Sequence, residues 1–587
     1  MVISNPIWRS MDPRQFFTQP STTKQRQYEA LRLYFLSDVT ADQVAQRFGY
    51  TKASLYSLIR DFKQQVGSGE NPFFTDVKQG RKPMDHSGEL KELIVSLRKK
   101  YLSVPDITAA IAAKGHTVSE KYVYNVIHQE GFDRLPRRRN EVKQQSSSAI
   151  PLAAPKAVTL SFDTETFVSQ NALGVLTLLP LAQRYGIIEL IGASAYPETQ
   201  SFDRVSSILS FVALKLSHAR RYTADDAWCM DRGLGLFAGL NVLPKAAWFS
   251  SYSHRVTREM NTKLLQGLYK LLETHGLLSD TVNLDFTTIP YWGDDSHLEN
   301  NWSGKRRTGL ASMLALICQD PGSGMLTYGD TTIRHTREGN ASVEFLDFSR
   351  KHGSGKLRYL VFDSRFTTYE NLARLDESVN FVTIRRRGKN IVDALDSIPS
   401  SSWKQVRVTR SNGKGQALKI YDSVEFLKAY GKEIRQIAIE GHGKIKPAIL
   451  ITNDFDRPAK EMVQIYARRW LVEKSISEQI EFFHLNRVSS SMVIKVDFDL
   501  TMTILAHNLL RLLAMDLTGF SHCTSMSLFE KFLDTGGSVS VEEDKIVVDL
   551  KKKRNLPALL TALQPYQKTA VSVLNNLPIV FQGNTRS

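Results

Sequence analysis

Cysteine is scarce in this chain. Its three cysteines lie far apart in 587 residues, without the paired spacing that a disulfide framework or a zinc site would show. So few unpaired cysteines fit a protein of a reducing compartment. Long apolar runs are also missing, because the most apolar stretch, 500–517, contains histidine, asparagine, arginine and aspartate. Since a membrane span needs about 20 apolar residues, we expect a buried amphipathic helix there and no membrane partner.

The N-terminus lacks a basic segment followed by an apolar one, so we expect no secretory signal and a soluble, cytoplasmic protein. Acidic residues do not balance the basic ones, since 76 Lys+Arg face 60 Asp+Glu, a net charge of +16. The excess is uneven: residues 1–157 hold 24 Lys/Arg and 15 Asp/Glu, a net of +9. Such a charge favours polyanions as partners, and its uneven distribution weakens the alternative of an inert basic surface. We expect double-stranded DNA as the partner and no small-molecule substrate.

The first 66 residues contain the pattern of a helix-turn-helix. Thr40 is placed to cap a short helix over 41–48, Gly49 supplies the turn, and Thr51 is placed to cap a helix over 52–63. The exposed face of this second helix offers three candidates for DNA contact: Lys52, Ser54 and Tyr56. An ordinary helical hairpin is the alternative, because the pattern is common by chance.

The same pattern returns at 104–114 and 119–129, with Gly115 at the turn. Between the two copies, Arg81 and Lys82 lie in a Gly-Arg-Lys-Pro segment suited to a narrow minor groove, with a plain turn linker as the alternative. Two such units joined by a basic linker resemble the paired-like DNA-binding region at the front of many transposases. The doubling favours DNA binding more strongly than either copy alone.

One motif points to another activity. Asp163 and Glu165, with Tyr222 and Asp226 downstream, are similar to motifs of proofreading-type 3′–5′ exonucleases. Only 63 residues separate Asp163 from Asp226, which is too few for the strands and helices between such motifs. A capping segment is therefore the favoured interpretation.

From residue 281 the pattern becomes one of strands alternating with helices. Asp285 lies within the short strand 282–287, and Asp363 directly follows the strongly apolar strand 357–362. Acids at the centres and ends of strands that lead into helices indicate an RNase H-like α/β core. Several short strands, divided by Asn-Gly and Gly-His-Gly turns, are expected over 406–453.

A third acid lies on a helix expected at 459–483. Tyr466, Arg469 and Glu473 are spaced i, i+3 and i+7, so they share one face of that helix. A helix face with a phenol, a guanidinium and a carboxylate would pack poorly in an apolar core. It is suited to a metal ion that lies against a phosphodiester. Because hard divalent ions prefer carboxylate oxygens, the three acids together predict metal-assisted phosphoryl transfer on a nucleic acid.

The contexts of the acids are specific. Asp285 lies in Leu-Asp-Phe-Thr-Thr-Ile, Asp363 in Val-Phe-Asp-Ser-Arg-Phe, and Glu473 ends a Tyr-x2-Arg-x3-Glu motif. This series, over roughly 160–520, resembles the DDE transposases of bacterial insertion sequences, in the superfamily named for its Tyr-Arg-Glu-Lys signature. The resemblance implies a β-rich insertion at about 390–455, before the last catalytic helix. It implies that the three acids bind two Mg²⁺ ions, which Mn²⁺ can replace. It also implies that the tyrosine and arginine of the motif hold the DNA backbone by the cleavage point.

The basic segment that contains Lys305 and Arg306 also resembles that family, between its first two acids, and is expected to contact DNA. One position departs from the family pattern: Ile480 stands where the signature lysine is expected, seven residues after the glutamate. That DNA contact is lost or supplied elsewhere. Arg386 and Arg387 are candidates, and a solvated basic turn is the equal alternative.

Three tryptophans lie close to these motifs in sequence: Trp292, Trp302 and Trp470. One of them could stack against an unpaired base at an element end. Burial in the core is the commoner role of such residues.

The sequence as a whole predicts a multidomain protein with an all-α helix-turn-helix region, an α/β RNase H-like catalytic core and a helical C-terminal part with a hairpin at 537–550. The expected domains are 1–66 and 67–135 (DNA binding), 136–157 (linker), 158–280 (helical), 281–490 (catalytic) and 491–587 (C-terminal, dimerisation). We expect a DNA transposase that binds terminal inverted repeats through residues 1–135, cleaves element ends and joins the 3′-OH to target DNA as a homodimer. The alternatives are a metal-dependent nuclease without strand transfer and an inactive, transposase-derived DNA-binding regulator.

Overall fold

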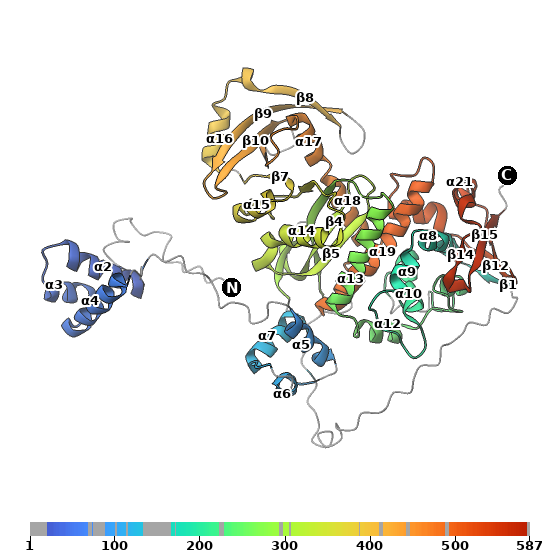
Figure 1. Ribbon diagram of the computed structural model, residues 1–587, viewed down its shortest axis with the longest axis horizontal. Coiled ribbons are helices and arrows are strands. Elements are labelled where there is room, and N and C mark those ends of the chain that lie inside the picture. Colours follow the sequence, from blue (N-terminus) through green and yellow to red (C-terminus); the bar gives the residue numbers. More distant parts are fainter. Residues whose placement is uncertain are drawn as a thin grey trace. The chain divides into compact units, whose positions relative to one another are not determined.

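The computed structural model divides the chain into two compact units, Met1–His86 and Ser87–Ser587 (Figure 1). It describes residues 20, 22–68, 73, 88–99, 102–112, 116–132, 135, 166–170, 172–221, 228–292, 298–303, 307–386, 388–409, 415–441, 447–487 and 492–583. Several predictions lie outside these residues: Arg81, Lys82, Lys305, Arg306, Arg387, the linker 136–157, and the exonuclease-like residues Asp163, Glu165, Tyr222 and Asp226.

The first unit contains the three helices α2 (Thr23–Leu36), α3 (Ala41–Phe48) and α4 (Lys52–Gly67). Their starts follow the expected caps, since the Gln43 side chain accepts from Thr40 N (3.0 Å) and Thr51 Oγ1 accepts from Ser54 N (3.1 Å). Gly49 has a φ of +69° between α3 and α4, a conformation that glycine adopts without strain. The helix–turn–helix geometry expected from the sequence is therefore present.

A second helical bundle, α5 (Glu89–Lys99), α6 (Val104–Ala112) and α7 (Glu120–Gln129), opens the second unit. Ser119 caps α7 by accepting from Tyr122 N, as expected. The apolar core of the bundle includes Met492 and Ile494. Val493 N donates to Glu130 O (3.2 Å), so the bundle packs on the segment that starts a long downstream helix.

Residues 172–274 are helical, as the sequence predicts. They form η3 (Leu173–Thr177), α8 (Leu178–Arg184), α9 (Ile187–Gly192), α10 (Arg204–Leu216), α11 (Arg232–Phe237), α12 (Ala246–Ser253) and α13 (Arg258–Thr274). Their buried faces join the largest apolar core of the protein, which also includes residues of the sheet and of the C-terminal part.

A ten-stranded sheet forms the centre of the second unit. Its strands are β2 (Thr281–Pro290), β3 (Asn300–Ser303), β4 (Thr308–Gln319), β5 (Leu326–Ile333), β6 (Tyr359–Val361), β7 (Asn380–Ile384), β8 (Lys404–Thr409), β9 (Gly415–Leu427), β10 (Lys432–Glu440) and β11 (Ala448–Thr452). The order is β3-β4-β2-β6-β7-β11-β10-β9-β8, with β5 also paired to β4. Strand β6 runs parallel to both β2 and β7, whereas β4 is antiparallel to β2. Helices α14 (Ala341–His352), α15 (Tyr369–Asp376) and α16 (Lys389–Asp396) and the short turns η5 (His335–Asn340) and η6 (Ser400–Ser402) connect these strands.

The predicted β-rich insertion corresponds to β8–β11. These strands continue the main sheet, because β11 pairs antiparallel with β7 at Leu450↔Ile384 and Thr452↔Val382. They share a second apolar core with α17, which follows them (Ala459–Ala467). The insertion is thus an extension of the main sheet rather than a free-standing lobe.

The helix expected at 459–483 is divided into α17 and α18 (Trp470–Glu481). At the junction Arg469 N bonds to Tyr466 O (2.9 Å) and Val472 N bonds to Arg469 O (3.0 Å), which is the i→i+3 spacing of a tightened turn. This turn ends α17 and leads into α18 shortly before Glu473.

The C-terminal part contains more strands than the single hairpin that was expected beside its helices. After α19 (Val493–Asp516) come α20 (Ser525–Leu528), η7 (Phe529–Leu533), β12 (Gly537–Val541), β13 (Ile546–Leu550), α21 (Leu556–Leu563), η8 (Gln564–Tyr566), β14 (Ala570–Val571), η9 (Ser572–Leu574) and β15 (Leu577–Gly583). The strands form a sheet of order β1-β12-β13-β15-β14, to which β1 (Thr166–Ser169) is added from far upstream. The predicted hairpin at 537–550 is the β12–β13 pair.

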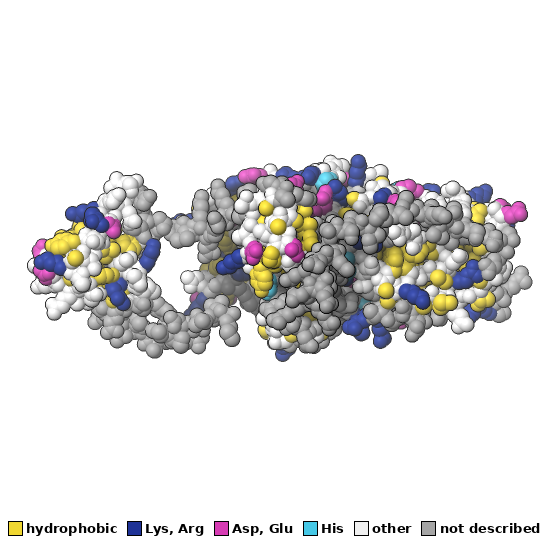
Figure 2. Space-filling view, turned by 90° about the horizontal axis from the view of Figure 1, so that it is seen from below, with side chains coloured by type: hydrophobic (Ala, Val, Ile, Leu, Met, Phe, Trp, Pro, Cys, Tyr) yellow, Lys and Arg dark blue, Asp and Glu magenta, His cyan; other side chains and the backbone are white. Residues whose placement is uncertain are grey.

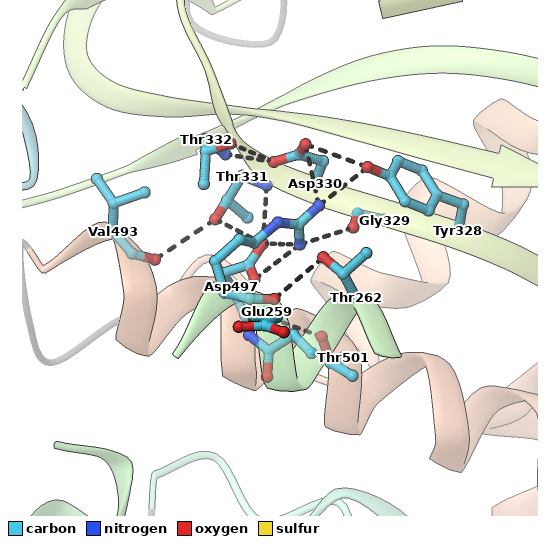
Figure 3. Close-up of polar contacts among 12 residues, drawn as sticks. Glu259, Thr262, Tyr328, Gly329, Asp330, Thr331, Thr332, Val493, Asp497 and Thr501 are labelled. Atoms are coloured by element: carbon cyan, nitrogen blue, oxygen red, sulfur yellow. Dashed lines mark hydrogen bonds and ion pairs between the residues drawn. The ribbon is translucent and has the colours of Figure 1, made fainter. Parts of the chain in front are cut away.

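A buried ionic network joins α13, β5 and α19 (Figure 3). Asp497, fully buried on α19, accepts from Arg258 Nη1 at 2.7 and 2.8 Å and from Asn261 Nδ2 at 2.7 Å. Arg258 also contacts Asp330 (3.0 Å) and donates to the Tyr328 hydroxyl (3.0 Å). Every charge in the network therefore has a partner of opposite sign or a hydrogen bond, as a buried ion pair requires.

The surface carries its charge in small groups. Figure 2 shows Lys and Arg side chains scattered among apolar and neutral ones over the described part of the face that it presents. In the described part of the chain, no helix is both long and apolar enough to span a bilayer.

Candidate active site

The two candidate aspartates lie on neighbouring parallel strands in matching positions. Asn283 of β2 pairs with Val361 of β6, so Asp285 and Asp363 each lie two residues beyond the same paired position. Because side chains alternate along a strand and neighbouring strands lie about 4.8 Å apart, both carboxylates project on the same side of the sheet. Asp363 Oδ1 accepts from Arg365 N (2.8 Å) in the turn that follows β6.

Side chains of β2 and β4 fix α18 against the sheet. Asn283 Nδ2 donates to Arg468 O (3.0 Å), and Gln319 Nε2 donates to Ser475 Oγ (2.5 Å). The first contact comes from β2, the strand that carries Asp285, and the second from its neighbour β4. They hold the tightened turn between α17 and α18 over β2, which brings Glu473 to the same site as the two aspartates.

Arg469 connects two of the three acids. Its Nη1 donates to Asp285 Oδ2 (3.0 Å) and its Nη2 to Glu473 Oε1 (2.5 Å). The guanidinium carbon lies 5.7 Å from the centre of the Tyr466 ring, and the arginine is 8% exposed. The structure thus gathers four residues: Asp285, Tyr466, Arg469 and Glu473. The two that are farthest apart in sequence, Asp285 and Glu473, are separated by nearly 190 positions.

The charges at the site are strongly coupled. Burial, aided by the charges of Asp363 and Glu473, raises the pKa of Asp285 to about 6, although Arg469 opposes this shift. Burial likewise raises the pKa of Tyr466 to about 12. The pKa of Arg469 is raised by the neighbouring Tyr466, Asp285 and Glu473, against the effect of burial, so it remains a cation. Displaced pKa values of this kind are common at functional sites.

The sequence analysis missed a second arginine beside the acids. Arg365 donates from Nε and Nη2 to the two carboxylate oxygens of Glu338, both at 2.8 Å. Its guanidinium lies 5.2 Å from the centre of the Phe286 ring, and that ring stacks on Phe366 at 4.1 Å. Arg365 was visible within the Asp-Ser-Arg-Phe motif, but its partner Glu338 lies 27 positions away and carries no local signal.

The donor set suits a hard divalent cation, because such ions prefer carboxylate oxygens, and the charges of Asp363 and Glu473 add to the burial that raises the pKa of Asp285. Among the described residues, however, no three Asp, Glu, His or Cys side chains are already gathered as a metal site. Arg469 stands between Asp285 and Glu473 and bonds to both. The ligands are therefore of the right chemical type, and a guanidinium bridges two of them.

Residues 278–509 match the family model of the transposase DDE domain. The chain contains a transposase DDE domain. The match runs from just before β2 into α19, and it includes all three acids and the strands β8–β11. No curated protein matches the chain significantly. A DDE domain implies DNA as partner, divalent metal ions and DNA transposition as the process served.

The other predicted residues of the DDE domain differ in their position in the fold and in their exposure. Arg386 is exposed just after β7, next in the sheet to the strand that leads to Asp363. Ile480 lies near the C-terminal end of α18 and is partly buried. Trp292, Trp302 and Trp470 are 54%, 62% and 54% exposed, so they are surface rather than core residues.

Proposed function

We propose that this protein is a DNA transposase that cleaves the ends of a mobile DNA element and joins the freed 3′-OH to target DNA. The observation that carries the proposal is the pair of ion pairs that Arg469 makes with Asp285 and Glu473, inside a DDE domain, with the charge of Asp363 near enough to act on Asp285. Acids this close repel one another, so they suit a function that brings a divalent cation and a phosphodiester to them.

The chain's own residues take distinct roles in this proposal. The three acids hold Mg²⁺, or Mn²⁺ in its place, which when bound neutralises the charge of the phosphodiester and stabilises the leaving oxygen. Arg469 orients Asp285 and Glu473 through its two Nη groups, and its permanent charge can bind a DNA phosphate. Tyr466 lies against that guanidinium and supports its position.

We further propose that the N-terminal helices bind the terminal inverted repeats. On α4, Lys52, Ser54 and Tyr56 are all exposed, as base and phosphate contacts require. Lys52 is paired with Asp42 in the isolated protein (2.8 Å), an exposed contact that a phosphate can replace at little cost.

The exposed tryptophans support the proposal that one of them stacks against an unpaired base at an element end. Cutting and joining two ends favours a homodimer on DNA.

The test is a cleavage and strand-transfer assay with labelled element-end DNA and Mg²⁺. We expect wild type to nick and join the DNA, and Glu473→Gln to bind it without reaction. Glu481→Gln is the matched control, because Glu481 lies on the same helix and is exposed. Specific binding without cleavage by wild type would favour an inactive DNA-binding regulator. Cleavage without joining would favour a nuclease.

A further inference from the structure

A cluster of basic side chains lies at the C-terminal end of α18, away from the three acids. It consists of Lys215, His218, Arg220, His484 and Arg487, and we refer to it as the basic cluster. The His218 and His484 rings are 4.5 Å apart, and His218 Nδ1 bonds to Phe482 O (2.8 Å). The end of α10 and the end of α18 meet here, which brings together residues more than 260 positions apart.

His484 is the unusual member of the basic cluster. It is 8% exposed, and its Nε2 is buried without a hydrogen-bond partner among the described residues. Its φ is +56°, a conformation that non-glycine residues adopt at a cost. A buried polar atom normally finds a partner, so an unpaired imidazole nitrogen suggests a ligand that supplies one.

The surroundings of His484 favour an anion as that ligand. Burial lowers the pKa of His484 to about 4, and the charges of its basic neighbours lower it as well. Lys215 is already paired with Asp499 (2.8 Å) and donates to Phe483 O (3.2 Å). Arg220 and Arg487 are exposed, so their guanidinium groups can turn toward a bound anion.

The position of the basic cluster relates it to the active site. From Glu473 to the end of α18 the helix rises about 12 Å, at about 1.5 Å per residue. A DNA strand advances about 3.4 Å per nucleotide, so this length corresponds to about four nucleotides. A strand that follows α18 from the acids would place one of its phosphates here.

We propose that the basic cluster binds a backbone phosphate of the DNA about four nucleotides from the cleavage point, with Arg487, Arg220 and His484 as its ligands. This inference rests on the proposed function, because it takes DNA as the bound molecule. It assigns a DNA contact on the helix whose signature lysine is replaced by Ile480. The competing structural role is compensation of the negative end of the α18 dipole by these cations.

The test is the salt dependence of binding by the full chain to a double-stranded element-end DNA, in buffer with EDTA so that no cleavage occurs. Arg487→Gln and Arg220→Gln should each lower the slope of log K against log salt by about 0.9, and the affinity about eightfold at 0.1 M salt. Arg350→Gln, an exposed arginine on α14, is the matched control and should change neither.

The outcomes separate the inference from the proposed function. Unchanged slopes in both variants, or a loss of thermal stability with an unchanged slope, would overturn the phosphate site and leave the dipole role. Tight binding of inorganic phosphate by wild type, with unchanged DNA slopes in the variants, would overturn DNA as its source. Failure of wild type to bind any element-end DNA would instead reject the proposed function.

Discussion

Asp285→Asn should stabilise the metal-free protein while abolishing its activity. Burial raises the pKa of Asp285 from 3.8 to about 6 even with Arg469 beside it. A displacement of this size means that the ionised carboxylate costs about 3 kcal/mol of folding free energy relative to the neutral form. Asparagine has nearly the same shape as the neutral acid and escapes this cost.

The pH dependence follows from the sign of the shift. Above about pH 6 the folded protein must ionise a carboxyl that prefers its proton, so wild type bears the full cost there. Below about pH 3.8 the carboxyl is protonated in both the folded and unfolded chain, and the cost vanishes. The stability gap between Asp285→Asn and wild type should therefore be largest at pH 7–8 and shrink steadily from pH 6 to pH 4.

Thermal unfolding of the full chain in EDTA, at pH 4.5, 6 and 8, measures this gap. For a unit of this size we expect a midpoint higher by on the order of 3–6 °C in the variant at pH 8. Mg²⁺ should raise the midpoint of wild type and leave that of the variant nearly unchanged. A variant less stable than wild type at pH 8, or a gap independent of pH, would refute the reasoning.

Three further predictions concern the supports of the fold and site. Asp497→Ala should lower the free energy of unfolding by about 3–5 kcal/mol, because the buried Arg258 loses one of its two acidic partners. Chemical denaturation followed by circular dichroism measures this loss, and a loss under 1 kcal/mol would contradict the prediction. Arg365→Lys should reduce cleavage about 10–100-fold, since lysine cannot bond both oxygens of Glu338; single-turnover cleavage should show it, and wild-type rates would exclude a positioning role. Gly49→Ala should destabilise the first helical unit by about 1–2 kcal/mol through backbone strain alone, because no atom lies within 4 Å of the added Cβ; proteolysis of α3 and α4 would report it, and unchanged protection would count against the turn.

Local sequence signals predicted the elements of the fold better than their assembly. The caps at Thr51 and Ser119 and the strands around Asp285 and 380–384 follow from residue types within a few positions, and the structure has them. The C-terminal sheet was missed, because β1 is recruited from more than 360 positions upstream and β14 has only two residues. No local pattern carries such pairings.

In the candidate site too, the local features could be predicted from the sequence and the distant contacts could not. The spacing of Tyr466, Arg469 and Glu473 was readable from the sequence, because a helix repeats every 3.6 residues. The break before Trp470 was not, since the residues around it are good helix formers and the turn is held by Asn283 on a distant strand. The contact between Asn283 and the backbone of Arg468 therefore outweighs the helix propensity of the residues around this break.

The charge balance also explains how the site tolerates Ile480. A lysine there would stand two helical turns, about 10 Å, from Glu473, so its charge would act only weakly on the buried acids. Arg469, bonded to Asp285 and Glu473 at 3.0 and 2.5 Å, is the cation that limits their repulsion. Under the proposed function, an isoleucine where the family's lysine is expected would therefore change a contact with DNA and leave the acids almost undisturbed. Replacing Arg469 would change both, because the same guanidinium holds two acids and can bind phosphate.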